Sequence, residues 1–125
     1  CGAICDGGMP TFMLTHWVRD RRRGPRLALE FVVQRQTAQT AALYGLHDRG
    51  LIAPGMRADV NVIDLDGLGF DVPRMAFDLP AGGRRLVQRG RGYVATFLGG
   101  VRTVDHDEFT GALPGRLLRA GRLVS

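Results

Sequence analysis

The chain has 125 residues, of which 45% are apolar, so it is long enough for one domain with a buried core and is not expected to be disordered. It has no apolar run near the roughly 18 residues of a membrane-spanning helix, and no signal segment at its start. The net charge of +5 comes from 17 basic residues, all of them arginine. Such a balance can indicate an anionic partner. A lysine-free, glycine-rich chain is also typical of a GC-rich genome, and we favour that explanation over nucleic-acid binding.

The two cysteines, Cys1 and Cys5, stand four residues apart at one end of the chain. They do not form a disulfide framework, so we expect a reduced, cytoplasmic protein without a membrane partner. The chain begins abruptly with Cys1, on a glycine-rich stretch. We therefore expect it to be a fragment of a longer protein or the product of processing.

The first third of the chain has helical periodicity. Residues 1–8 read as a glycine-rich loop, and Pro10 suits the first turn of a helix. We expect this helix to end at Gly24-Pro25, after an arginine-rich run, 19–23, that complements the helix dipole.

Two shorter helices are expected next. The pattern over residues 28–36 predicts a helix that turns Leu29, Val32 and Val33 inward. A third segment over residues 39–44 ends at Gly45.

A change of periodicity follows the helices. Residues 46–55 form a connector that closes with Pro54-Gly55, a pair suited to a type II turn. The alternation over residues 58–65 then predicts a strand, with Val60 and Val62 on one face and Asp59, Asn61 and Ile63 on the other. Asp66-Gly67 closes this strand.

The rest of the chain predicts a small sheet. Pro73 and Pro80 make residues 70–80 irregular, residues 81–83 form a turn, and residues 84–88 form a short strand with Leu86 inward. Residues 93–98, Gly99-Gly100 and residues 101–104 predict a β-hairpin, and a loose polar tail follows Asp105. So few strands leave edges unpaired, and we expect further strands from another chain or from a missing part of this one.

No complete catalytic constellation is visible in the sequence. Cys1, Cys5 and His16 lack the paired spacing of a structural zinc site, His47 and His106 have no histidine partner nearby, and Ser125 stands at the extreme end. A triad of Cys5, Asp6 and His16 is conceivable, but nothing brings the three together. Glycines 82 and 83 fit a hairpin turn better than a phosphate loop. The residues closest to a nucleic-acid surface are Arg84, Arg85, Arg89, Arg91 and Tyr93.

Several segments nevertheless resemble a known family. The junction segments are Leu43-Tyr44-Gly45-Leu46, Asp48-Arg49-Gly50, Pro54-Gly55 and Ala58-Asp59-Val60-Asn61-Val62-Ile63-Asp64. They resemble the C-terminal junction of the metal-dependent amidohydrolase superfamily. Six further segments are Ile4-Cys5-Asp6, Pro10-Thr11, Leu14-Thr15-His16-Trp17, Arg19-Asp20, Phe77-Asp78-Leu79-Pro80-Ala81-Gly82-Gly83-Arg84-Arg85 and Thr110-Gly111-Ala112-Leu113-Pro114-Gly115-Arg116. They look like the N-acyl-D-amino-acid deacylase branch, the D-aminoacylase type.

This resemblance implies an α/β fragment. Residues 1–50 would be the last helices and a loop of a (β/α)8 barrel, and residues 51–125 the C-terminal part of a small companion β-sandwich domain with a polar tail. The Asp-Gly turn common after the final hairpin in this family is absent from Asp105-His106-Asp107-Glu108, which leaves the local turn geometry open.

The resemblance also implies a function. The parent enzyme would hydrolyse N-acyl-D-amino acids by attack of a zinc-activated water, with every metal ligand and the catalytic aspartate in the remainder of the parent chain. We expect no catalytic or metal residue in this segment and no activity from it alone. Cys1, Cys5 and Asp6, in a loop on the catalytic face of the barrel, either line the substrate pocket or only shape the loop. The alternatives are another cyclic-amide or dipeptide hydrolase of the superfamily, or a non-enzymatic binding or assembly module.

Overall fold

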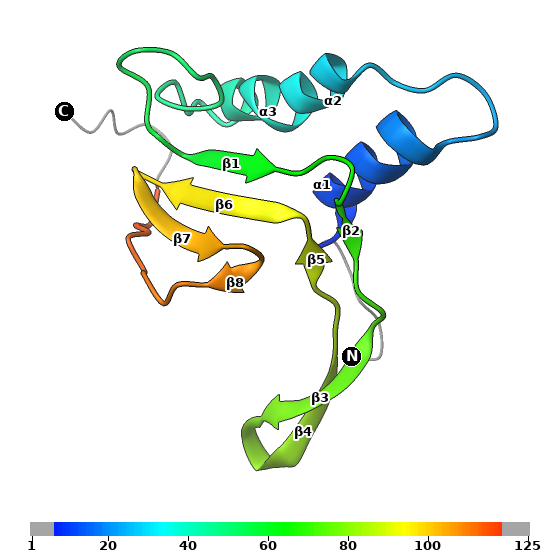
Figure 1. Ribbon diagram of the computed structural model, residues 1–125. Coiled ribbons are helices and arrows are strands. Elements are labelled where there is room, and N and C mark those ends of the chain that lie inside the picture. Colours follow the sequence, from blue (N-terminus) through cyan, green and yellow to red (C-terminus); the bar gives the residue numbers. More distant parts are fainter. Residues whose placement is uncertain (1–6, 119–125) are drawn as a thin grey trace.

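The computed structural model describes residues 7–118. Four helical segments come first: α1 (Met9–Phe12), η1 (Met13–Asp20), α2 (Leu29–Gln36) and α3 (Ala38–Leu43). A four-stranded antiparallel sheet follows, in the order β1 (Val60–Ile63), β6 (Tyr93–Leu98), β7 (Val101–Asp105) and β8 (Glu108–Phe109). The helices lie along one side of this sheet (Figure 1).

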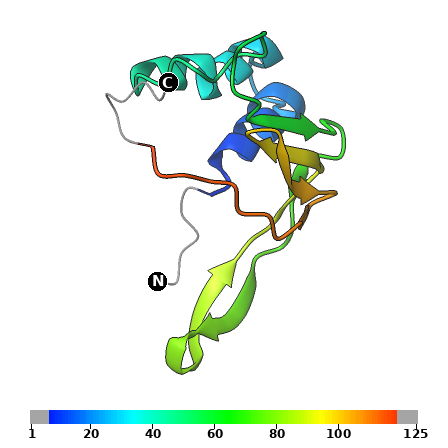
Figure 2. The ribbon, with the colours of Figure 1, turned by 90° about the vertical axis from the view of Figure 1, so that its left-hand side faces the viewer.

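Two short two-stranded ladders lie outside this sheet. Strand β2 (Gly69–Phe70) pairs with β5 (Gly90–Arg91), and β3 (Arg74–Leu79) pairs with β4 (Gly83–Val87) across the turn η2 (Pro80–Gly82). The β3–β4 hairpin, which we call the arm, projects away from the helices and the main sheet (Figures 1 and 2).

The first helix is wound more widely than an α-helix and ends early. Segment η1 is a π-helix, and the Arg21 N–H donates to the His16 carbonyl five residues back at 2.8 Å. The prediction that this helix reaches Gly24 is therefore wrong. The helix ends because Arg21 has an extended backbone (φ −59°, ψ 126°). The chain then turns back, and the Leu27 N–H donates to the Trp17 carbonyl at 2.9 Å.

The core between the helices and the sheet is small. Leu14, Val32 and Leu68 are buried together, and partly buried apolar side chains surround them: Met13, Val18, Leu27, Ile63, Leu65 and Tyr93. The inward position of Val32 is confirmed. The inward positions of Leu29 and Val33 are wrong, because these side chains remain 37% and 43% exposed.

The helix-to-strand junction follows the prediction closely. Helix α3 ends at Leu43, Gly55 has a φ of +84°, and the Met56 N–H closes the turn onto the Ala53 carbonyl at 3.1 Å. Strand β1 is shorter than expected, and a register shift between Val62 and Ile63 interrupts the alternation. Ile63 thereby reaches the core, while Val62 stays 45% exposed.

Residues predicted to be irregular form strand β3, which corrects the sequence interpretation. Pro73 immediately precedes the strand and Pro80 immediately follows it, so neither removes a ladder hydrogen bond. The turn at residues 81–83 is confirmed, with Ala81 and Gly82 at φ values of 59° and 69°.

The β6–β7 hairpin is confirmed, but the loose tail after Asp105 is wrong over its first residues. His106 and Asp107 adopt positive φ values of 45° and 66°, and the chain turns back into β8. These two residue types tolerate that region better than most non-glycine residues. The Asp107 carboxylate also accepts the N–H groups of Gly92 at 3.0 Å and Tyr93 at 2.6 Å, so this turn is anchored without an Asp-Gly pair.

None of the helices in residues 7–118 has both the length and the hydropathy required to cross a bilayer.

The loop before β2 and the loop before β6 approach each other closely at Leu68 and Gly92. At Gly92 (φ +93°), a Cβ would lie 2.7 Å from the Leu68 Cα.

We expect Gly92→Ala to destabilise the protein by well over about 1 kcal/mol, because alanine is strained at positive φ and would also clash with backbone. Gly100→Ala is the matched control, since Gly100 has a φ of +80° but no atom within 4 Å of its would-be Cβ. Urea unfolding of both variants measures the difference. Equal losses would show that the contact with Leu68 is relaxed at little cost.

Candidate functional site

Residues near the start of the described chain and from the strands line a small pocket of about 250 Å³. The lining comes from the two residues before α1, from α1, β2, β5 and β6, and from the segment before β5: Gly7, Gly8, Thr11, Phe70, Gln88, Gly90 and Tyr93. A Cβ at Gly8 would lie 3.0 Å from the Phe70 ring, so glycine is what allows the loop to approach β2 this closely.

Two hydroxyl groups meet at the wall of this pocket. The Thr11 Oγ1 and Tyr93 Oη lie 2.5 Å apart and join the first helix to strand β6. The Gln88 amide donates to the Asp71 carbonyl at 3.1 Å. These groups can hydrogen-bond a polar ligand, and among the described lining residues no nucleophile is paired with a base.

The sequence did not reveal Thr11, Gln88 or Tyr93 as neighbours. Thr11 and Tyr93 are 82 positions apart, and no local spacing links them. Cys1, Cys5 and Asp6, which were expected either to line the substrate pocket or only to shape the loop, lie outside the described residues. Gly7 and Gly8, the next residues along the chain, line the small pocket.

The three histidines do not converge. His16 stacks on Phe12 at 5.0 Å and meets Trp17 edge-on at 5.4 Å, which makes it part of an aromatic cluster. His47 is exposed, and the His106 ring lies 2.6 Å from the Asp105 carboxylate at the β7–β8 turn. Across residues 7–118, no group of three or more His, Cys, Asp or Glu side chains is placed to hold a metal ion.

The arginines considered for nucleic-acid binding are partly engaged elsewhere. Arg85 forms a bidentate ion pair with the Asp78 carboxylate, with both hydrogen bonds at 2.7 Å. Arg89 lies 3.0 Å from Glu108 across the fold. These pairs reduce the positive charge that this strand pair could offer to phosphates.

The junction that carries the family resemblance is an ion-pair network. The Asp59 carboxylate accepts Arg49 Nη1 at 3.0 Å, Arg57 Nε at 3.1 Å and the Gly99 N–H at 2.7 Å. Arg49 also donates to both carboxylate oxygens of Asp48, from Nε at 2.8 Å and from Nη2 at 3.0 Å. One carboxylate thus ties the connector, the start of β1 and the β6–β7 turn together, and the motif has a structural role.

Arg19 makes a second link of the same kind. Its Nη1 donates to the carbonyls of Leu65, Asp66 at 3.0 Å and Leu68 at 2.9 Å, and its other nitrogens hold Asp20. Its hydrogen bonds to Asp20 raise the pKa of Arg19 and lower the pKa of Asp20. The first arginine of the arginine-rich run therefore fastens η1 to the loop after β1, a contact that the sequence did not predict.

Comparison with known proteins identifies the family. A model of the amidohydrolase family matches residues 4–104, and the chain therefore belongs to that family. The match supports a hydrolase of the metal-dependent amidohydrolase superfamily. Searches among curated proteins and among solved structures found no match.

We expect Asp59→Asn to cost about 1.5–3 kcal/mol of unfolding free energy, because it weakens two charge-assisted hydrogen bonds at a partly buried site. Asp78→Asn is the control. This change also disrupts a bidentate pair with arginine, but the Arg85 and Asp78 side chains are about half exposed (51% and 50%). The loss of unfolding free energy should therefore be far smaller. Denaturant unfolding of the two variants compares them. A loss at Asp59 no larger than that at Asp78 would contradict the structural role of the junction.

The bidentate arginine–aspartate pairs also predict that the stability of the fold decreases in acid. Hydrogen bonds from Arg19, Arg49 and Arg85 lower the pKa values of Asp20, Asp48 and Asp78 below the usual 3.8. Folding therefore favours the ionised forms, and this stabilisation is present above about pH 4 and lost as the pH falls through the folded-state values. We expect the melting temperature to fall less steeply with acid in Asp48→Asn than in the unaltered protein. Parallel curves would count against the Asp48 contribution.

Proposed function

We propose that this chain is the C-terminal part of an N-acyl-D-amino-acid deacylase of the D-aminoacylase type. The family match over residues 4–104 supports an amidohydrolase. The finer assignment rests on the motifs at residues 77–85 and 110–116. The reaction would add water across the amide bond of an N-acyl-D-amino acid and release a carboxylate and a free D-amino acid.

The proposal assigns zinc to the remainder of the parent chain. The residues described here do not fit a metal site, because their histidines and carboxylates do not converge. The contribution of this chain would be to shape the edge of the active site. We propose that Cys1, Cys5 and Asp6 line the substrate pocket, because Gly7 and Gly8, which directly follow them in the chain, line the small pocket beside Thr11 and Tyr93.

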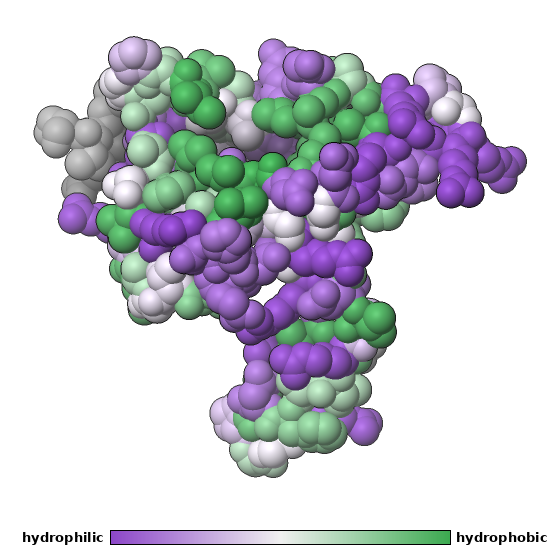
Figure 3. Space-filling model, in the orientation of Figure 1, coloured by the Kyte–Doolittle hydropathy of each residue, from purple (hydrophilic) through white to green (hydrophobic). Residues whose placement is uncertain are grey.

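The same proposal gives the helices a partner. Helices α1 and α2 and the end of α3 expose large apolar side chains: Met9 at 67%, Phe12 at 46%, Phe31 at 43%, Val33 at 43% and Leu43 at 80%. Figure 3 shows apolar surface over the helical side of the molecule. Helices of a (β/α)8 barrel bury such faces against the barrel strands, so we assign this surface to the barrel of the parent enzyme and the four-stranded sheet to its companion β-domain.

The direct test is an assay of the full-length protein with N-acetyl-D-methionine. We expect release of D-methionine, little reaction with the L-enantiomer, loss of activity with a chelator and recovery with zinc. The 125-residue chain alone should be inactive. Hydrolysis of a dihydropyrimidine or a dipeptide instead would favour another branch of the superfamily, and no hydrolysis of any of these would favour a binding or assembly module.

The role of the loop has its own test. We expect Asp6→Asn to lower kcat/KM for the D-substrate by about tenfold or more, because a polar contact to the substrate is lost. Asp71→Asn, an exposed change outside the small pocket, is the control. Unchanged kinetics in Asp6→Asn would mean that Asp6 only shapes the loop.

A further inference from the structure

The start of the first helix is held by contacts with other elements, because it has no cap of its own. Gly8 stands at the N-cap position of α1 without a side-chain hydrogen bond, and Pro10 has no N–H. The Phe70 ring, on β2, lies so close to Gly8 that a Cβ there would be 3.0 Å away. Gln36 of α2 donates to the Pro10 carbonyl at 3.2 Å, but this contact is exposed. The helix start therefore takes its position from its neighbours.

Thr11 is the first buried residue of this helix within the described chain. It is 4% exposed, and among residues 7–118 its hydroxyl has one hydrogen-bond partner, the Tyr93 hydroxyl at 2.5 Å. Thr15, one turn further along and 7% exposed, instead donates to the Phe12 carbonyl of its own helix at 3.4 Å, a local bond that threonine often makes in helices. Thr11 is thus the buried threonine that links the helix to the sheet.

Tyr93 is itself fixed along its whole length. Its N–H donates to the Asp107 carboxylate at 2.6 Å, and the Asp107 N–H donates to the Tyr93 carbonyl at 2.9 Å. The ring packs against the buried core and beside Gly90, where a Cβ would lie 3.2 Å from it. A tyrosine side chain has only two torsions that orient its ring. Its hydroxyl is therefore held in one place relative to the sheet.

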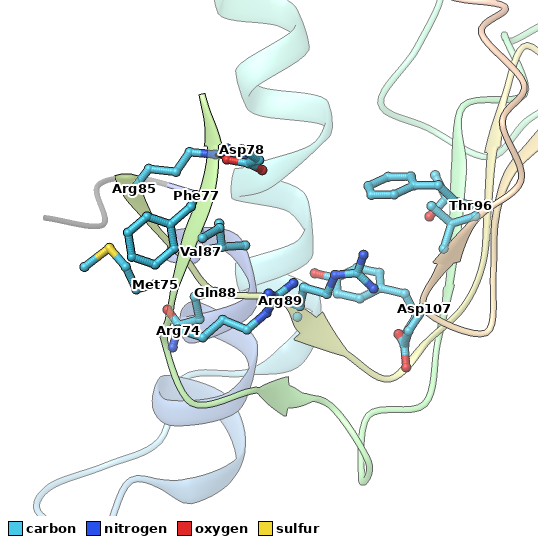
Figure 4. Close-up of a pocket in the computed structure, with 15 residues that line it drawn as sticks. Arg74, Met75, Phe77, Asp78, Arg85, Val87, Gln88, Arg89, Thr96 and Asp107 are labelled. Carbon is cyan, nitrogen blue, oxygen red and sulfur yellow. Dashed lines mark hydrogen bonds and ion pairs between the residues drawn. The ribbon is translucent and has the colours of Figure 1, made fainter. Parts of the chain in front are cut away.

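Two hollows meet this side chain. Tyr93 lines the small pocket, and it also lines an open cleft of about 820 Å³ between the arm and the main sheet, where Asp107 lies (Figure 4). On the side of the small pocket, Tyr93 and Thr11 are joined by Gly7 and Gly8. The contact between the two hydroxyls thus lies beside the point where the described chain enters its first helix.

Under the proposed function, on which this inference rests, the residues directly before Gly7 line the substrate pocket. We propose that Tyr93 is a positioning residue of the parent enzyme. Through Thr11, its hydroxyl sets where the chain leaves the substrate-lining segment and enters the helix. A displacement of about 1 Å far from the reacting atoms can cost about a hundredfold in rate, so a strand of the sheet acts on the substrate site without touching the substrate.

Kinetics of the full-length protein with N-acetyl-D-methionine test this role. Tyr93→Phe keeps the ring and loses only the hydroxyl. We expect KM to rise at least about fivefold and kcat to change less than about twofold, because a displaced pocket wall weakens the binding of substrate and transition state equally. Tyr44→Phe is the matched control, since Tyr44 is the other tyrosine of the chain and is 66% exposed. A lower apparent kcat at unchanged KM would indicate only a smaller folded fraction, and that result or unaltered kinetics would overturn the proposal.

A double-mutant cycle tests whether Tyr93 acts through Thr11. We expect Thr11→Val to raise KM as Tyr93→Phe does, and the double variant to be no worse than either single variant, because both changes remove the same contact. Thr15→Val, a buried threonine of the same helix with a local partner, should leave KM unchanged. Additive effects of Thr11→Val and Tyr93→Phe would show that the two residues act separately and would contradict the proposal.

Hydrogen exchange, followed by mass spectrometry of the full-length protein, tests the contact without an enzyme assay. We expect peptides within residues 7–14 to exchange faster in Tyr93→Phe than in the unaltered protein or in Tyr44→Phe, with peptides from α2 unchanged. Equal exchange in residues 7–14 would overturn the positioning role even if the enzyme assay succeeds. Faster exchange in a protein that does not hydrolyse N-acetyl-D-methionine would support the positioning of the helix start and refute only the proposed function.

Discussion

The Asp59 carboxylate is the point on which the two halves of the chain depend. It receives guanidinium groups from both sides of the Pro54-Gly55 turn and a backbone N–H from the β6–β7 turn, and its side chain is only 20% exposed. A partly buried carboxylate between two cations is stabilising only while all its partners are present. Since Asp59 directly precedes β1, the same contacts also set where that strand begins against β6.

Polar links of this kind matter because the hydrophobic core is small. Only Leu14, Val32 and Leu68 form its buried centre among the described residues. The helices are therefore held to the sheet largely by two directed contacts, Arg19 on the carbonyls after β1 and Thr11 on Tyr93. Directed contacts fix orientation more strictly than apolar burial does. They explain how an open arrangement with many exposed apolar side chains still has one geometry.

The sequence predicted those features whose cause is local. Gly99-Gly100 predicted the hairpin and Pro54-Gly55 the junction turn, because each turn is decided by the backbone preferences of two residues. Strand β3 was missed because Pro73 and Pro80 were read as interrupting a strand that they only border. Strand β8 was missed because a His-Asp pair formed a turn usually given to glycine. The small pocket was beyond prediction, since Thr11 and Tyr93 meet only once the whole sheet has formed.

The most recognisable motif and the small pocket belong to different parts of the molecule. The Asp48-Arg49 and Arg57-Ala58-Asp59 segments are engaged in holding the connector, β1 and the β6–β7 turn, and their charges are satisfied by one another. A motif whose charges are satisfied internally contributes to the fold and leaves little for a ligand. Recognition of a polar ligand would instead need groups with spare hydrogen-bonding capacity. The small pocket has such groups, because the Thr11 and Tyr93 hydroxyls and the Gln88 amide keep donors or acceptors beyond the bonds they make to one another and to Asp71.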